Sequence, residues 1–337
     1  MSYLKKMGVL QINEVLPVDS ALLCFASFER RCYTLAQNIK GDKYKKAYIF
    51  RNVDPPMDKN NSENFYKICD SLENFSAVEV NLDLPVVLAD KMFLVILEII
   101  HAQIKNIIID ISTFTHEALL ILLKIVYVQR SSFDSIFLVY NGAAEYATWL
   151  SMGCRNIRNV IGFPGLFNPA YKNHLIVLTG FEKERATKLV ELFEPDILSI
   201  GYGSEPTDKN HLETMQKMKE DFNDWFGNIG LPWTKFDFSC TQIDSTMNQV
   251  TEIINNGQNE NIILVPLNTK LSTISVALIA LQNKRIQIVY PIPETYNLQY
   301  SRPSDNFTVI NLKKVPEFYD YSQCGATKCR KKGDKTV

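Results

Sequence analysis

The stretch Ala26-Ser-Phe-Glu-Arg-Arg31 follows an apolar run at 21–25, and Thr179-Gly-Phe-Glu-Lys-Glu-Arg185 follows another at 175–178. In each case a predicted strand leads through a Phe-Glu turn with basic residues into a predicted helix, at 32–39 and 186–193. A strand, a tight turn and a helix form the first step of a Rossmann-like unit. Phe28 and Phe181 are 153 residues apart. We therefore expect two copies of one unit.

The order of the predicted strands is the same in both halves. They are placed at 21–25, 46–51, 77–81, 106–111 and 135–140 in the first half, and at 175–178, 197–202, 235–239, 261–266 and 285–290 in the second. Predicted helices separate most of these strands. The β-branched run at 106–111 is typical of a parallel strand buried on both faces.

Short sequence landmarks repeat at nearly the same spacing. Pro56-Met-Asp-Lys-Asn60 and Pro206-Thr-Asp-Lys-Asn210 agree at four of five positions, and Tyr140 recurs as Tyr290. The sequence thus predicts an α/β protein with an internal duplication: two tandem Rossmann-like units, with mainly parallel sheets and helices on both faces. We expect the units to pack as a pseudo-twofold pair whose strand-end loops face a shared cleft or lie near each other.

The predicted boundaries follow from this repeat. Residues 1–140 form the first unit, 141–173 a connecting segment with one helix near 143–152, 174–312 the second unit, and 313–337 a C-terminal extension with a basic, disordered tail. A strand is also expected near 308–312.

Composition narrows the class of protein. The chain has 337 residues, of which 46% are hydrophobic and 22% charged, as in globular proteins. Its net charge of −1 gives no electrostatic support for a nucleic-acid or membrane partner. Seven cysteines and four histidines are dispersed, so no metal site is predicted. An odd, unpatterned cysteine count and the lack of an apolar N-terminal segment favour a soluble, cytoplasmic protein.

Candidate site residues follow from the sheet topology. In open parallel sheets, ligands bind outside the carboxyl ends of the strands. This rule selects polar residues in both halves: Glu29, Arg30, Arg31, Asn52, Asp54, Ser112, Thr113 and Thr115, then Glu182, Lys183, Arg185, Tyr202, Ser204, Asn268, Thr269 and Lys270. Hydroxyls and free amides at a helix start bind anions, and nearby arginine or lysine adds charge-assisted hydrogen bonds.

Several alternatives stay open for these residues. Glu29 and Glu182 either contact a ligand or bond backbone amides and nearby basic side chains. Ser112 and Thr113 either contact a ligand or cap a helix. His116 is expected at a helix surface. Neither GxGxxG nor GxxxxGK[ST] is present, so we expect no dinucleotide cofactor of the usual type, no other cofactor and no P-loop NTPase.

The two predicted sites differ in charge. The first has Asp110 before its Ser-Thr motif, whereas the second has Lys270 where the first has Phe114. We therefore expect the second half to hold the charged part of a ligand through Lys270 and Arg185. The first half would then read a less charged part through Ser112 and Thr113.

The hydroxyl-rich motifs after the fourth strands, Asp110-Ile-Ser-Thr-Phe-Thr115 and Leu267-Asn-Thr-Lys-Leu-Ser272, give the chain a family resemblance. It resembles the CRISPR-associated Rossmann-fold domains, and two such units in one chain are similar to SAVED sensors. The resemblance covers about residues 20–295, although the paired glycines of the usual motif are absent. It implies binding of cyclic nucleotides or oligonucleotides in prokaryotic antiviral defence, through Ser112, Thr113, Asn268, Thr269 and Lys270.

We expect a ligand-sensing or scaffold protein that binds a nucleotide-like or other anionic small molecule. Because no effector domain is evident, a protein partner is expected to supply the output activity. The first alternative is an enzyme acting on a nucleotide or phosphoester, with Glu29 or Glu182 as acid/base. The second is a structural subunit of a larger complex.

Overall fold

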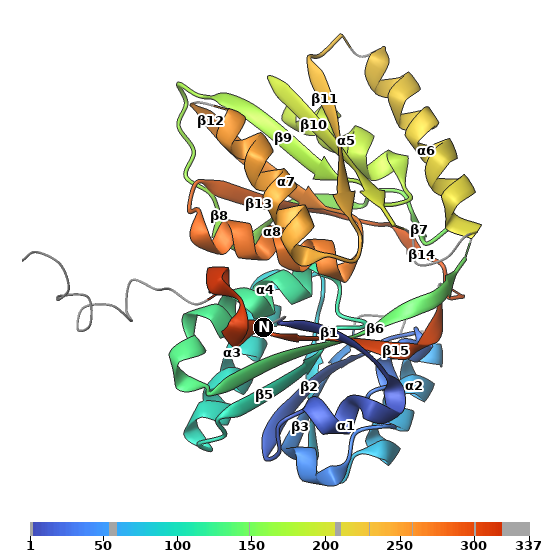
Figure 1. The fold of residues 1–337 in the computed structure, drawn as a ribbon, viewed down its shortest axis with the longest axis vertical. Coiled ribbons are helices and arrows are strands. Elements are labelled where there is room, and N and C mark those ends of the chain that lie inside the picture. Colours follow the sequence, from blue (N-terminus) through green and yellow to red (C-terminus); the bar gives the residue numbers. More distant parts are fainter. Residues whose placement is uncertain are drawn as a thin grey trace, which may run out of the picture.

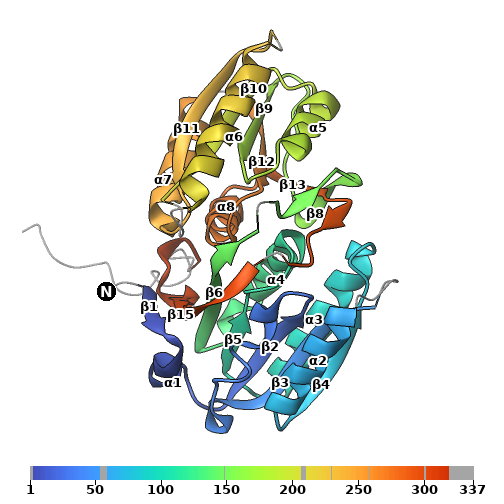
Figure 2. The ribbon, with the colours of Figure 1, turned by 90° about the vertical axis from the view of Figure 1, so that its right-hand side faces the viewer.

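The computed structural model describes residues 3–53, 59–147, 149–205, 210–228, 230–257, 259–299 and 301–318. Two α/β units lie one above the other, each built around its own sheet (Figure 1). Helices α4 (His116–Val128) and α8 (Lys270–Gln282) pack against each other between the two sheets (Figure 2). One hydrophobic core extends through both units, which therefore form a single packed body.

The first sheet contains seven strands in the order β1-β15-β6-β5-β2-β3-β4. Its parallel strands are β2 (Ser20–Ala26), β3 (Tyr44–Asn52), β4 (Phe75–Val80), β5 (Asn106–Asp110) and β6 (Ser135–Tyr146). Two antiparallel strands complete one edge, β15 (Ser301–Asn311) and β1 (Leu4–Gly8).

The second sheet contains six strands in the order β11-β10-β9-β12-β13-β8. Its parallel strands are β9 (Lys172–Leu178), β10 (Ile197–Ser204), β11 (Trp233–Ser239), β12 (Glu260–Pro266) and β13 (Ile286–Ile292). The antiparallel strand β8 (Asn156–Pro164) completes the edge beside β13.

The two units share one topology. When the parallel strands of each unit are numbered along the chain, both sheets have the order 3-2-1-4-5. This order places the first and fourth strands side by side at the centre, which is the switch point of a Rossmann-like sheet. The predicted α/β fold with two tandem Rossmann-like units is confirmed.

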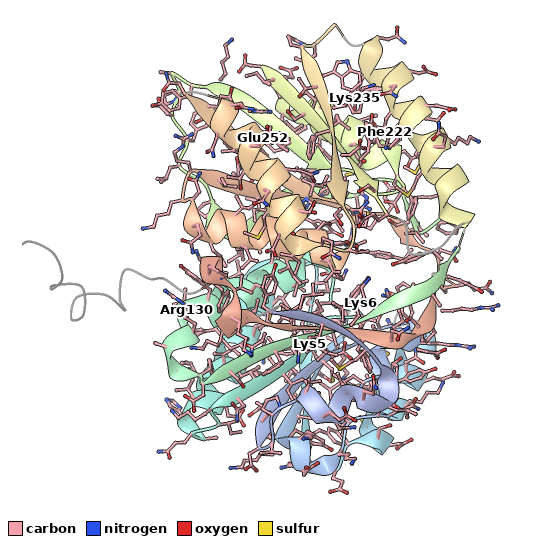
Figure 3. All side chains as sticks on the ribbon, viewed as in Figure 1. Lys5, Lys6, Arg130, Phe222, Lys235 and Glu252 are labelled. Atoms are coloured by element: carbon pink, nitrogen blue, oxygen red, sulfur yellow. The ribbon has the colours of Figure 1, made fainter. Side chains whose placement is uncertain are left out.

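Helices cover both faces of each sheet. In the first unit, Leu22 and Cys24 of β2 face the layer of α1 (Ile12–Val15) and α2 (Lys59–Ser71), whereas Leu23 and Phe25 face α3 (Pro85–His101) and α4. This alternation follows from the two-residue period of a strand. In the second unit, α5 (Lys183–Phe193) and α6 (Asn210–Gly227) pack together, as do α7 (Ile243–Asn256) and α8. Phe222, which is labelled on α6 in Figure 3, is fully buried and contacts Tyr202 of β10.

The units exchange their edge strands. The segment that follows the first unit's last parallel strand enters the second sheet as β8, and the segment that follows the second unit's last parallel strand enters the first sheet as β15. On the way, β7 (Ser151–Met152) and β14 (Thr295–Tyr296) pair with each other. Each unit is therefore completed by a strand that follows the other unit in the chain.

Two predicted helices are wrong. The helix expected near 143–152 is replaced by the end of β6 and by β7, because this backbone pairs with β15 and β14 from the far end of the chain. The helix expected at 32–39 is a short 3-10 helix, Arg30–Tyr33, followed by turns. The strand expected at 308–312 is the end of the longer β15. In the part of the chain that is described, no helix is long and apolar enough to span a membrane.

Candidate functional site

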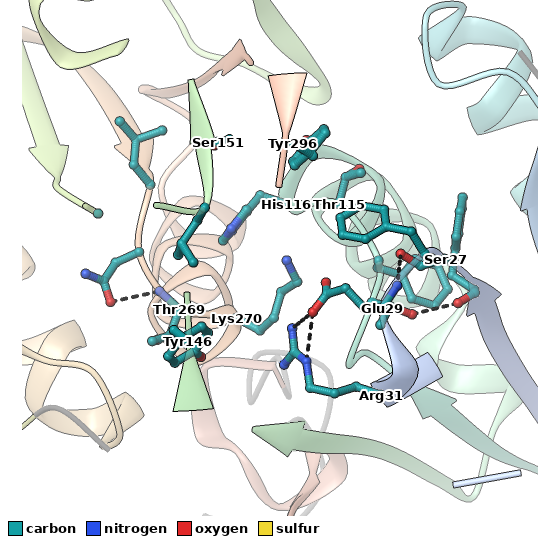
Figure 4. A pocket seen from close by; sticks show the side chains of 18 of the residues that line it. Ser27, Glu29, Arg31, Thr115, His116, Tyr146, Ser151, Thr269, Lys270 and Tyr296 are labelled. Carbon is teal, nitrogen blue, oxygen red and sulfur yellow. Dashed lines mark hydrogen bonds and ion pairs between the residues drawn. The ribbon is translucent and has the colours of Figure 1, made fainter. Parts of the chain in front are cut away.

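A pocket of about 250 Å³ lies between the units, where the carboxyl ends of strands from both sheets meet (Figure 4). Residues from both Phe-Glu turns and from the starts of α4 and α8 line it. The two strand-end regions therefore form one shared site, as the pseudo-twofold packing predicts.

A glutamate–arginine pair from the first Phe-Glu turn forms one side of the pocket. Arg31 donates from Nη2 and Nε to Oε2 of Glu29 over 2.6 and 2.9 Å, and its Nη1 donates to the carbonyl of Asn141 over 3.0 Å. Ser301, on the exchanged strand β15, donates to the same Oε2 over 2.7 Å. These bonds fix the Glu29 carboxylate and neutralise most of the charge of the pair.

The second Phe-Glu turn repeats this arrangement on the opposite side. Arg185 forms an ion pair with Glu182 and donates from Nη1 to the carbonyl of Pro291 over 3.3 Å. Ser151 of β7 donates to the other oxygen of Glu182. Each carboxylate is thus held by the arginine of its own turn and by a serine from an exchanged segment.

Aromatic rings line the walls in matching pairs. Phe28 packs on Tyr296 with ring centroids 5.9 Å apart, and Phe181 packs on Tyr146 at 6.4 Å. The Arg31 guanidinium lies 6.0 Å from the ring centroid of Tyr140. Flat rings of this kind offer stacking surfaces for a planar ligand group.

Helices α4 and α8 both begin at the pocket. Thr115 caps α4 by accepting from the amide of Ala118 over 3.1 Å, and Thr269 caps α8 by accepting from the amide of Ser272 over 3.3 Å. The first amides of a helix have no partner within it, and the helix dipole makes this end positive. Both helix starts therefore favour an anion in the pocket.

Lys270 and His116 occupy the first position of α8 and α4, after the capping residues Thr269 and Thr115. Lys270 therefore corresponds to His116, and its predicted match with Phe114 is wrong because the first motif reaches its helix cap two residues later. Burial, followed by the charges of Lys270 and Arg185, lowers the pKa of His116 well below its usual value, so its ring is neutral. Its Nδ1 is 2.6 Å from Oγ1 of Thr273, and its ring lies 5.8 Å from that of Tyr290. Figure 4 shows both side chains facing the centre of the pocket.

The pKa of the Lys270 amine is close to neutral pH, so both its charged and its neutral form are populated there. Burial lowers its pKa to about 7; Glu29 opposes this shift, whereas the charges of Arg31 and Arg185 reinforce it. Among the described residues, Nζ of Lys270 has no hydrogen-bond or ion-pair partner. An anionic ligand would supply that partner and raise the pKa again.

Most of the predicted site residues meet in this pocket. Those that line it are Glu29, Arg31, Asn52, Thr113, Thr115, Glu182, Arg185, Asn268, Thr269 and Lys270. Arg30 is exposed outside it, and Lys183, Ser204 and Tyr202 also lie outside its lining. Asp54 lies outside the described residues.

The hydroxyl groups of the first motif face inward rather than toward a ligand. Ser112 is buried, donates to Asp110 and accepts from the amide of Asn141 over 2.9 Å. Thr113 lines the pocket, but its hydroxyl donates to the carbonyl of Phe25 over 2.6 Å. Asp110 is likewise buried outside the lining, so it is not the residue that makes the two sides of the pocket differ.

Sequence reasoning missed three kinds of site residue. The candidate residues did not include Ser151 and Ser301, which bond to the carboxylates. They also did not include Tyr146 and Tyr296, which line the walls. Both pairs recur 150 residues apart, the spacing that already links Tyr140 to Tyr290, so the repeat itself could have found them. His116 was expected at a helix surface, but the second unit covers the start of α4.

A serine–histidine–glutamate group also lies in the second sheet, away from the pocket. His174 contacts Oε2 of Glu260 through Nδ1 at 2.7 Å and Oγ of Ser199 through Nε2 at 2.8 Å. All three residues are buried, and Ser199 also bonds to Thr234 over 2.9 Å. Because the serine has no access to a substrate, this group is a structural hydrogen-bond network and not a nucleophilic site.

Known proteins include a solved structure with weak similarity to this chain. No protein-family model and no curated protein matches the chain. Among solved structures, the binary complex of leucoanthocyanidin reductase with NADPH from Vitis vinifera is similar at 10% sequence identity, over 68% of this chain and 82% of that one, with a TM-score of 0.25.

Proposed function

We propose that this protein binds an anionic, nucleotide-like small molecule in the pocket between its two units. The observation that supports this best is the position of Lys270: its amine lacks a partner among the described residues and faces a pocket where two helices begin. A phosphate or carboxylate there would gain a charge-assisted hydrogen bond and the favourable ends of two helix dipoles. The aromatic walls suit a planar base.

The proposal favours binding over catalysis. Glu29 and Glu182, the two carboxylates expected as acid/base candidates, are each held by an arginine and a serine. These contacts fix both side chains as part of the pocket wall, which suits ligand binding better than proton transfer to a substrate. A role as ligand sensor or scaffold, with a partner protein supplying the output, agrees with this arrangement.

The resemblance to CRISPR-associated Rossmann-fold and SAVED domains directs the choice of ligands. It makes cyclic nucleotides and oligonucleotides in prokaryotic antiviral defence part of the proposal, alongside mononucleotides and other small anions. An action inside the cytoplasm is part of the same proposal.

A thermal-shift screen tests the proposal. The panel should contain nucleoside mono-, di- and triphosphates, cyclic nucleotides, inorganic phosphate and small dicarboxylates. A ligand at one hundred times its dissociation constant stabilises the protein by about 2.7 kcal/mol, which gives a clear rise in melting temperature. Each ligand that raises it should be recovered and analysed by mass spectrometry, because a sensor returns it unchanged and an enzyme converts it.

The variant Lys270→Met supplies the site-specific control. We expect it to abolish the ligand-induced shift, while Lys183→Met, at the first position of α5 but outside the pocket lining, keeps it. If no anion raises the melting temperature of the parent protein, the binding proposal fails and a structural role is favoured.

A further inference from the structure

The two ends of the pocket are not equivalent, although most of its lining is paired. Glu29 corresponds to Glu182, Arg31 to Arg185, and Thr115 to Thr269. The rings and serines are paired in the same way: Tyr140 with Tyr290, Tyr146 with Tyr296, and Ser301 with Ser151. Against this background, the first residue of the pocket helix is His116 in α4 and Lys270 in α8.

Because one position holds a lysine and the other a histidine, the Lys270 end and the His116 end of the pocket differ in charge. Lys270 lies within electrostatic range of Glu29 and Arg31, a pair whose charges cancel, so that end has one positive charge when the amine is protonated, and an anion bound beside it favours the protonated form. His116 lies beside Tyr290 and within electrostatic range of Lys270 and of Arg185, which is paired with Glu182. Since the His116 ring is neutral, that end has no net charge.

The two ends also offer different hydrogen-bonding groups. Nζ of Lys270 can only donate, and three donors suit the oxygens of a phosphate or carboxylate. At His116, Nδ1 is engaged with Thr273, and within the described residues Nε2 has no hydrogen-bond partner. A neutral imidazole nitrogen suits the polar edge of an uncharged group such as a base.

We propose that the pocket binds its ligand in one orientation, with a single anionic group at Lys270 and a neutral, planar polar group at His116. This inference rests on the proposed function and narrows its ligand class. The cavity of about 250 Å³ is close to the lower end of the range of about 300–1,000 Å³ that is typical of small-molecule pockets. A nucleoside monophosphate fits these features, whereas a twofold-symmetric ligand with two anionic groups places one of them at the neutral end.

Calorimetric titration at pH 7 with three kinds of probe tests the orientation. The probes are the four ribonucleoside 5′-monophosphates, the corresponding nucleosides and a symmetric cyclic dinucleotide. For the preferred base we expect one monophosphate per chain, at least tenfold tighter than the nucleoside and at least tenfold tighter than the cyclic dinucleotide.

Two variants assign the ends. Lys270→Met should reduce the affinity for the monophosphate to that for the nucleoside, while the nucleoside affinity changes less than twofold. His116→Phe should weaken both ligands by the same factor, and His116→Gln, which places an amide near the position of Nε2, should restore part of the loss. Lys270→Arg keeps the charge and should retain the preference for the monophosphate, which separates loss of charge from misfolding.

The outcomes distinguish this inference from the general function. If none of the probes binds but another anion from the screen does, or if the cyclic dinucleotide binds at least as tightly as the monophosphate, the one-way orientation is wrong and anion binding stands. The orientation is equally wrong if Lys270→Met weakens nucleoside and monophosphate by the same factor, as His116→Phe is expected to do. If no anion of any kind binds, the proposed function itself fails.

Discussion

Ser301 donates a hydrogen bond to Glu29 over 2.7 Å, although 271 residues separate them in the chain. Ser151 makes the corresponding bond to Glu182 in the other unit. Both serines lie on segments exchanged between the units, so the strand exchange and the pocket are built by the same backbone. Both carboxylates of the site therefore keep their serine bonds only when the two exchanged segments are in place.

Loss of either serine hydroxyl should destabilise the protein. A hydrogen bond to a charged group contributes about 1.5–3 kcal/mol, so Ser301→Ala and Ser151→Ala should each lower the free energy of unfolding by about that amount. Urea denaturation measures the change. Ser71→Ala removes a hydroxyl that bonds only the preceding helical turn on an exposed face, and it should be nearly neutral. Equal effects of all three substitutions would show that the serines do not support the carboxylates.

Asp110 should make the stability of the protein fall as the pH rises. Burial raises the pKa of its carboxyl to about 7, although hydrogen bonds from Ser112 and the charge of Arg31 oppose the shift. Between the ordinary value of 3.8 and about 7, the folded state binds more protons than the unfolded state, so stability is lost across this interval. Asp110→Asn should therefore stabilise the protein by about 1–3 kcal/mol at pH 8 and have little effect at pH 4.

Thermal unfolding of the parent and Asp110→Asn from pH 4 to pH 8 measures this difference. Asp70→Asn, which replaces a carboxyl on the exposed side of α2, is the matched control for the substitution itself. A constant difference between parent and Asp110→Asn at all pH values would mean that the Asp110 carboxyl titrates normally.

Anion binding should weaken above pH 7. The pKa of Lys270 is lowered to about 7, first by burial, so the free protein loses the ammonium as the pH rises through this value. The affinity for a nucleoside monophosphate should fall about fivefold between pH 7 and pH 8 and approach tenfold per further unit. The phosphate does not confuse this range, because its own second pKa is about 6.

Calorimetry at pH 7, 8 and 9 measures the slope. Lys270→Arg should remove the pH dependence and keep binding, since arginine stays charged throughout. The charged groups that act on the amine are Glu29, Arg31 and Arg185, and His116 is a neutral ring because its own pKa is lowered well below the usual value. An unchanged slope in Lys270→Arg would assign the titration to another group.

The buried group of His174, Ser199 and Glu260 should affect stability alone. Ser199→Ala leaves the histidine without one partner, and His174→Ala leaves the buried Glu260 carboxylate without its own, so each should cost about 1–3 kcal/mol or more. Denaturation experiments check the cost. Hydrolysis of an activated ester such as p-nitrophenyl acetate should be the same in the parent and in refolded Ser199→Ala. A loss of hydrolysis in this variant would show that the serine is accessible.

The sequence predicted the strands of both sheets well because their patterns are local. The three isoleucines within Asn106–Asp110 are buried, and such a continuous β-branched run is typical of a parallel strand covered on both faces. The ends of those strands then identified most of the residues that line the pocket. The repeated landmarks correctly indicated two units that share one topology.

The remaining features depend on contacts between distant segments. The strand at Ala143–Tyr146 forms because β15 pairs with it, and its sequence alone resembles a helix. Whether Arg30 or Arg31 enters the pocket is decided by the 3-10 turn that contains them, which leaves Arg30 exposed and buries Arg31. His116 reaches the pocket because α8 covers the start of α4. The sequence of one unit alone does not predict these contacts, because they are made by segments of the other unit.

The proposed site for an anion is at Lys270, between the two units. A crystal structure of the protein with a nucleoside 5′-phosphorothioate tests it most directly, because the added sulfur marks the anionic group by its anomalous scattering. We expect a ligand sulfur peak inside the pocket, with a phosphate oxygen within hydrogen-bond distance of Nζ of Lys270 and the base toward His116. A ligand peak outside the pocket, or one at the His116 end with Lys270 unpaired, would contradict it.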